Sequence, residues 1–148
     1  MKQYNREDIL RLTFQAYRKS ALTVAVPILV GGTIPTLEGE KKAYAGDYLC
    51  FGVAGECWPI RKANFEAEKV KVADLPNGLA TYASTSTRHA IRIDEQFVVM
   101  KETGEVSYTS ESNGGYLVWN GKDGAEFAAW IVQKDIFEQS YEPTEGVA

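Results

Sequence analysis

The chain has 148 residues, a net charge of −4, and 45% hydrophobic and 11% aromatic residues. This composition is that of a globular protein and excludes a disordered or low-complexity chain. The acidic balance offers no basic face for duplex nucleic acid, so a partner of that class is not expected.

The first predicted element is a helix from about Arg6 to Lys19. Asn5 is a suitable N-cap, and Leu10, Phe14 and Tyr17 follow at spacings of four and three that place them on one helical face. We expect this helix to cover one face of a sheet.

Strands are predicted next. Residues 21–30 are rich in β-branched side chains and indicate a buried strand, and residues 33–42 indicate a polar connection. Residues 44–53 and 56–60 then predict the clearest hairpin, closed by a two-residue turn at Ala54–Gly55.

The middle of the chain begins with a charged segment, residues 61–69, predicted to form one or two helical turns. The turn-rich run DLPNG, residues 74–78, is the best candidate for a boundary between two halves. Residues 80–88 predict a strand or a mobile loop, and residues 90–100 predict a strand.

The last part of the chain repeats the earlier order of elements. Residues 116–120 and 125–132 predict a second hairpin, and residues 134–141 mirror the short segment after the first hairpin. The polar tail from Glu142 is expected to fray.

The two hairpin regions align as diverged copies of one unit. Three residues of the first copy match residues 68 positions later, and five more match residues 72 positions later, with extra loop residues between. The matched pairs are Tyr48/Tyr116, Leu49/Leu117 and Phe51/Trp119, then Trp58/Trp130, Ile60/Val132, Lys62/Lys134, Phe65/Phe137 and Glu66/Glu138.

The predicted fold class is therefore α+β, predominantly β. An N-terminal helix (about 6–19) precedes two related β-hairpin units, about 20–73 and 79–141, which form a pseudo-symmetric sheet or small barrel. We expect residues 1–148 to form a single compact domain.

One stretch resembles a segment found in small phage and prophage proteins. The segment has a PGDY-type motif, matched here by Gly46-Asp47-Tyr48-Leu49, Gly52, Gly55-Glu56, Trp58-Pro59-Ile60 and Phe65-Glu66. Ala45 stands where that family has its usual proline. The resemblance implies a phage-like origin and carries no activity or catalytic residue.

The two cysteines allow two interpretations. With a two-residue turn, Cys57 would lie opposite Gly52, with Cys50 diagonal to it on the same face, which permits a metal or redox site. We favour two core thiols, because buried cysteine often behaves as a small hydrophobe and the second copy has Val118 and Phe127 in these places.

The sequence contains no clear catalytic or cofactor signature. His89 is the single histidine, and the common nucleotide-loop and zinc motifs are absent. No cofactor and no metal site are therefore predicted, and no catalytic residue is assigned. A hydrolase or phosphodiesterase built on His89 with Asp94 or Glu95 remains an alternative.

Aromatic and basic residues form the candidate ligand site. An aromatic side chain can stack on a base while Arg or Lys binds its phosphates. The alternative is that the aromatic residues fill the core. The candidate ligand-binding residues are Tyr48, Trp58, Arg61, Lys62, Arg88, His89, Arg92, Tyr116, Trp119, Trp130 and Lys134.

These observations favour a phage-encoded, non-catalytic small-ligand binding protein. Its expected ligand is a host immune signalling nucleotide, such as a cyclic nucleotide, that the protein sequesters. A protein-binding inhibitor or adaptor acting on a host protein is the second hypothesis. We expect a homo-oligomer in the host cytoplasm without a membrane partner, because no apolar run approaches a membrane span.

Overall fold

The computed structural model describes residues 1–37 and 39–144. Half of the chain is strand and 18% is helix, which confirms the predicted α+β, predominantly β class. No sheet in these residues closes into a barrel. Contacts divide the chain into unit 1, residues 1–18 and 87–148, and unit 2, residues 19–86. Whether the two units form one compact domain stays a prediction.

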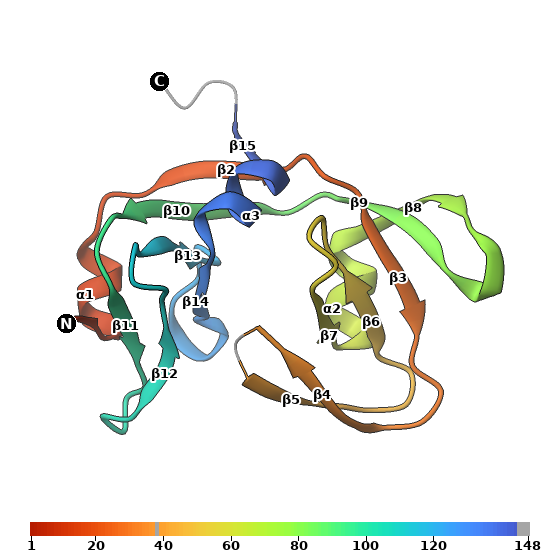
Figure 1. Ribbon diagram of the computed structural model, residues 1–148, viewed down its shortest axis with the longest axis horizontal. Helices are drawn as coiled ribbons and strands as arrows, with labels where there is room; N and C mark the ends of the chain where they lie inside the picture. The colour runs from red at the N-terminus through yellow and green to blue at the C-terminus, as the bar shows by residue number, and fades with distance from the viewer. Residues whose placement is uncertain (38, 145–148) are drawn as a thin grey trace. The chain divides into compact units, whose positions relative to one another are not determined.

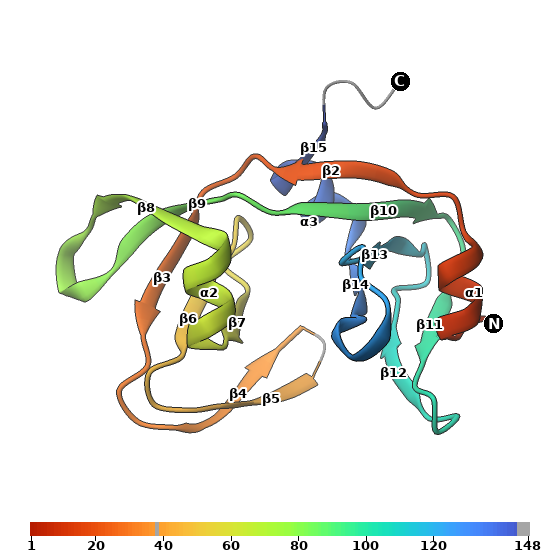
Figure 2. The same cartoon turned by 180° about the vertical axis from the view of Figure 1, so that it is seen from behind.

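Unit 2 consists of a five-stranded sheet, one helix and a separate two-stranded hairpin (Figure 1). The sheet has the order β7-β6-β3-β9-β8, and α2 lies across one of its faces (Figure 2). Its elements are β3 (Thr23–Pro27), β4 (Gly32–Thr36), β5 (Gly39–Ala43), β6 (Tyr48–Phe51), β7 (Cys57–Ile60), α2 (Lys62–Glu68), β8 (Lys69–Asp74), the 3-10 turn η1 (Pro76–Gly78) and β9 (Ala80–Ser84).

Unit 1 has a second five-stranded sheet, in the order β14-β13-β10-β2-β15, and a three-stranded sheet, β1-β11-β12. Its elements are β1 (Lys2–Tyr4), α1 (Arg6–Arg11), β2 (Gln15–Lys19), β10 (Thr87–Ile93), β11 (Phe97–Met100), β12 (Val106–Thr109), β13 (Gly115–Trp119), η2 (Gly124–Glu126), β14 (Ala129–Val132), α3 (Lys134–Ser140) and β15 (Tyr141–Pro143).

The N-terminal helix is shorter than predicted. Asn5 is the N-cap, as predicted, and forms a capping box with Asp8, but α1 ends at Arg11. Residues 15–19 form β2, which pairs with β10. The extension of the helix to Lys19 is wrong because the pairing with β10 and the packing of Tyr17 on Phe137 outweigh the helical spacing.

Three further predictions of local structure need correction. Residues 33–42 are the β4–β5 hairpin rather than a connection, because β4 pairs with β5 along its whole length. Residues 90–100 are split into β10 and β11 by a turn at 94–96. Residues 74–78 comprise the end of β8 and the turn before β9, inside unit 2, so they are not the boundary between the folded units.

The two five-stranded sheets have equivalent strand orders and registers. In unit 2 Cys50 pairs with Trp58 and Ala25. In unit 1 Val118 pairs with Trp130 and Ala90 in the same way. The shifts of 68 and 72 between the sequence copies therefore join residues at equivalent positions of the sheets. Descent of the two copies from one ancestor stays a prediction.

Each helix places a phenylalanine between two tyrosines of its sheet. In unit 2 the Phe65 ring stacks on Tyr48 at 3.9 Å and meets the edge of Tyr82 at 4.7 Å. In unit 1 Phe137 stacks on Tyr116 at 4.0 Å and meets Tyr17 at 4.9 Å. Both phenylalanines are at most 2% exposed, so this triad anchors each helix to its sheet.

The triads show that the units exchange one strand, in the sense that each five-stranded sheet contains one strand from the other half of the chain. Tyr82 belongs to β9, which follows the turn at 76–78, yet it completes unit 2. Tyr17 belongs to β2, at the start of the chain, yet it completes unit 1. Tyr17 and Tyr82 are 65 residues apart, as are Ala25 and Ala90, so β2–β3 and β9–β10 are equivalent segments.

These two segments pair antiparallel in one register. In unit 1, β2 pairs with β10 so that paired residue numbers add up to 105. In unit 2, β3 pairs with β9 with the same sum. The orange segment from β2 into β3 and the green segment from β9 into β10 can be followed in Figure 1. The chain passes from one unit to the other in both segments without a change of register.

Strand exchange predicts that the chain survives a cut in the β8–β9 turn. A protease site placed at residues 76–78 divides the chain into two fragments, but each unit then still contains strands of both fragments. We expect the cut protein to elute as one species on size exclusion and to separate only in denaturant. Two fragments that separate without denaturant would contradict the exchange.

Candidate functional site

The turn before β6 is built around a buried carboxylate, Asp47, which is 6% exposed. Its Oδ2 atom accepts the N–H of Tyr44 at 3.1 Å, and its Oδ1 atom accepts the N–H of Lys62 at 3.2 Å. Lys62 is the first residue of α2, so Asp47 supplies from a distant turn the cap that α2 lacks locally. The sequence motif contained Asp47, but the ligand-site prediction omitted it.

Arg61 and Lys62 lie at this turn. The Arg61 guanidinium is 4.4 Å from the centre of the Tyr44 ring, and its Nε atom is 3.9 Å from Asp47 Oδ2. Lys62 contributes its backbone N–H. In unit 1 the position of Asp47 is Gly115, so the equivalent turn of unit 1 has no carboxylate at this position.

Replacing Asp47 tests its capping role. Asp47→Ala leaves two backbone N–H groups without their acceptor, so we expect unfolding free energy to fall by about 1–3 kcal/mol in urea denaturation. Asp47→Asn keeps one acceptor oxygen and should cost less. Asp74→Ala is the control, because Asp74 is exposed and its carboxylate forms a surface ion pair with Lys71. Equal losses for Asp47→Ala and Asp74→Ala would contradict the role.

The two cysteines lie on opposite faces of their sheet. The β6–β7 loop is one residue longer than predicted, because Gly52 pairs with Glu56 and Gly55 adopts a φ of 77°. Cys57 therefore lies opposite Phe51, not Gly52, and Cys50 lies opposite Trp58. The equivalent of Cys57 is Ala129 rather than Phe127. This geometry leaves the two thiols without a shared metal or redox site.

Cys50 is a core thiol, as predicted. It is fully buried, and burial raises the pKa of its thiol to about 11. Cys57 is half-buried, and its Sγ atom lies 3.7 Å from the carbonyl oxygen of Pro35.

We predict that only Cys57 reacts with a thiol reagent at pH 8 in the folded protein. At pH 8 the solution is about three pH units below the pKa of the Cys50 thiol, so only about 0.1% of this thiol is ionised. The Cys50 side chain is also inaccessible to the reagent. Cys57→Ser should abolish the fast reaction, Cys50→Ala should leave it intact, and unfolding should release a second thiol. If both thiols reacted with the reagent at the same rate in the folded protein, this geometry would be wrong.

The candidate residues Tyr48 and Tyr116 are part of the aromatic triads. Both rings stack on a helix phenylalanine. The Tyr116 hydroxyl donates to Glu138 at 2.8 Å, and burial together with this carboxylate raises the Tyr116 pKa to about 12. Lys134 Nζ also binds Glu138, at 3.0 Å. These three candidate residues therefore stabilise helix packing.

Arg92 is bound to the backbone of its own unit. Its NH1 atom donates to the carbonyls of Ile93 and, at 2.9 Å, Gly115, and its NH2 atom donates to Asn113 at 3.0 Å. The guanidinium thus holds the loop that leads into β13, and these bonds engage the donors that a phosphate would use.

His89 and Trp119 lie together on the face of the sheet opposite α3. Their ring centres are 5.4 Å apart, and the Trp119 Nε1–H donates to the carbonyl of Lys122 at 2.9 Å. Phe14 also packs against Trp119, with ring centres 5.5 Å apart. No hydrogen bond joins His89 to a carboxylate within the described ranges, so the geometry lends no support to a hydrolase built on His89.

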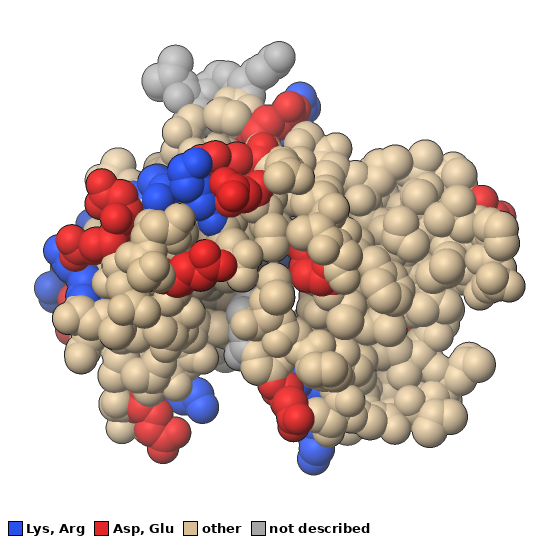
Figure 3. All heavy atoms as spheres, in the orientation of Figure 1, with Lys and Arg blue, Asp and Glu red and all other residues tan. Residues whose placement is uncertain are grey.

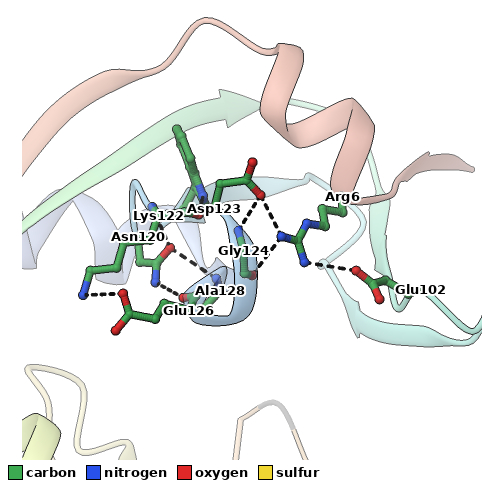
Figure 4. Close-up of polar contacts among 9 residues, drawn as sticks. Arg6, Glu102, Asn120, Lys122, Asp123, Gly124, Glu126 and Ala128 are labelled. Carbon is green, nitrogen blue, oxygen red and sulfur yellow. Dashed lines mark hydrogen bonds and ion pairs between the residues drawn. The ribbon is translucent and has the colours of Figure 1, made fainter.

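Sequence reasoning missed Arg6, which ties three segments of unit 1 together (Figure 4). Its guanidinium donates to Glu102 at 3.0 Å, to Asp123 at 2.7 Å and to the carbonyl of Gly124 at 2.8 Å. The guanidinium also lies 4.8 Å from the centre of the Phe127 ring. The hydrogen bond from Arg6 lowers the pKa of the Asp123 carboxyl. No local pattern reveals pairs 96 and 117 residues apart.

Trp58 and Trp130 are the candidate residues that remain half-exposed and next to a cation. They occupy equivalent positions on the edge strands β7 and β14, on the helix-covered faces. Lys19 Nζ lies 5.0 Å from the Trp58 ring centre, and the Arg88 guanidinium lies 5.6 Å from that of Trp130. Lys19 and Arg88 come from non-equivalent positions, yet each unit places one cation over its tryptophan.

A shallow cavity of about 290 Å³ lies elsewhere, between β1 and α1 of unit 1. It contains none of the candidate ligand residues. Its lining residues are Lys2, Gln3, Tyr4, Asp8, Arg11 and Leu12. In the part of the chain that the structure describes, no three His, Cys, Asp or Glu side chains gather where they could hold a metal ion. Nor do the described residues include a helix with the length and apolarity to cross a membrane.

Comparisons with protein-family models, with curated proteins and with solved structures find no match to this chain.

Proposed function

We propose that the protein is a phage-encoded, non-catalytic binding protein for a small planar anion, of which a nucleotide is the favoured class. The observation that supports this function is the tryptophan with a cation over its ring at the same place in both units. A tryptophan face offers stacking to a base, and the neighbouring Lys or Arg offers donors to a phosphate.

The chemistry of these two places requires binding and no reaction. Trp58 and Trp130 supply rings that are half-buried against their helices, so little side-chain freedom is lost when a ligand stacks. Lys19 and Arg88 supply the positive charge. A host signalling nucleotide sequestered in this way is expected to stay intact.

Binding of a nucleotide can be tested by thermal shift with a panel of linear and cyclic nucleotides, followed by mass spectrometry of the recovered ligand. We expect a shift, and recovery of the ligand unchanged. Loss of a charge-assisted hydrogen bond costs about 1.5–3 kcal/mol, so Lys19→Gln and Arg88→Gln should each weaken binding about tenfold or more.

Arg11→Gln is the control, because Arg11 is an exposed cation on α1 that forms a long ion pair with Glu7, at 3.9 Å. It should leave the affinity unchanged. A panel without any shift, recovery of a cleaved nucleotide, or equal effects of Arg11→Gln and Arg88→Gln would contradict the proposed function.

A second candidate function is binding of a host protein as an inhibitor or adaptor. Its support is the uneven distribution of exposed large hydrophobic residues, of which nine of the twelve among the described residues lie in unit 2. Pull-down from a host lysate with a stoichiometric protein partner, together with no nucleotide shift, would favour it over the first.

A further inference from the structure

Unit 2 has a smaller core than unit 1, although their sheets are equivalent. Eleven hydrophobic residues of unit 1 are buried among the described residues, but only five of unit 2, and three of these five are alanines. The five are Ala25, Ala43, Cys50, Phe65 and Ala80. A unit of this size with so few buried large side chains has little hydrophobic stabilisation of its own.

The difference in the number of buried hydrophobic residues comes from the sheet face opposite the helix. In unit 1 this face carries Leu117, which is fully buried, and Ile131, which is 7% exposed. The equivalent residues of unit 2 are Leu49 and Pro59, and both are only half-buried. The same residue type at the same place in the sheet is thus covered in one unit and open in the other.

The N-terminal residues provide the cover in unit 1. Ile9 of α1 and Phe97 of β11 pack with Leu117 in one buried cluster, and β1 extends β11 into a three-stranded sheet. In unit 2 the position of Phe97 is Gly32, and the hairpin β4–β5 gains no third strand. The hairpin contacts β7 but leaves the side chains of β3 and β6 half-buried.

The rim of this face also differs. After β10 the chain of unit 1 turns with Asp94 and Glu95, which are exposed and solvated. The equivalent residues after β3 are Leu29 and Val30, which are 86% and 83% exposed. Two large apolar side chains at the place where the other unit has two carboxylates indicate a surface that contacts another polypeptide.

The open face carries no charged side chain. We define it by Val24, Val26, Leu49, Phe51, Val70 and Thr81, which register places on the side away from Phe65. The view of Figure 3 looks onto this side of unit 2, because α2 lies behind the sheet there, and the surface over β3, β8 and β9 is almost entirely uncharged. A chain of net charge −4 can meet its own copy here without like-charge repulsion.

We propose that the open face binds the open face of a second copy of this chain, which forms a two-fold symmetric dimer. An uncharged, apolar sheet face can pack on an identical face, and two sheets pack face to face at about 10 Å when both carry apolar side chains. Each copy then covers Leu49 and Phe51 of the other, as residues 1–14 cover the equivalent face in unit 1. This inference does not depend on the proposed ligand.

The full-length chain can be tested by light scattering on size exclusion. We expect a mass about twice that of the 16.4 kDa chain. Val70→Glu places a charge on the open face at a side chain that is 55% exposed, so folding should persist while the mass falls twofold to that of one chain. Leu29→Glu, at the rim, should weaken the dimer in the same direction.

Val106→Glu is the matched control, because Val106 is a strand valine of unit 1 with similar exposure, 50%. It should leave the dimer intact. Circular dichroism of each variant checks that the fold is retained. A monomeric wild-type chain, a dimer that survives both Val70→Glu and Leu29→Glu, or equal dissociation by Val106→Glu would overturn the proposal.

Discussion

The pairing of segment β2–β3 with segment β9–β10 is the constraint on which both units depend. Paired residue numbers add up to 105 in each unit, so the two units share the same pairing register. A shift by one residue would turn Ala25 and Ala90 out of both cores and separate both tyrosines from their phenylalanines. The equivalence of the two sheets follows from this pairing.

The two equivalent sheets are covered in different ways on the face opposite the helix. In unit 1, α1, β1 and Phe97 close the face opposite the helix, and Arg6 fixes them to the 120–128 loop. In unit 2 a polar hairpin with Gly32 takes the place of β11, and Leu49 and Phe51 stay half-buried. Functional differences between the units are therefore expected on this face, whereas the helix-covered faces, with Trp58 and Trp130, are nearly alike.

Local patterns in the sequence predicted the β6–β7 and β13–β14 hairpins, α2, α3 and the matched residues of the two copies. They did so because aromatic and glycine positions repeat at short range, as in Tyr48 to Trp58 and Tyr116 to Trp130. Strand β2 was mistaken for helix because Leu10, Phe14 and Tyr17 satisfy helical spacing, and only its distant partner β10 decides its structure. The extra residue in the Gly55 turn reversed the predicted face of Cys57.

The candidate site was predictable only in part, for a similar reason. Aromatic and basic residues were identified from their type, but type does not tell a core ring such as Tyr48 from an edge ring such as Trp58. Arg92 is engaged by carbonyls that lie far along the chain. Asp47 was visible in the motif, but its role as the cap of α2 requires knowing that residues 47 and 62 meet in space.

The exchange of strands also sets the order in which the chain can fold on the ribosome. Unit 2 becomes complete once β9 has emerged, because all its strands lie within residues 19–86. The first eighteen residues must wait unpaired until β10 follows, although they are synthesised first. Pairing over such a separation is slow because a long loop must close. Unit 2 can therefore be complete before the beginning and the end of the chain pair in unit 1.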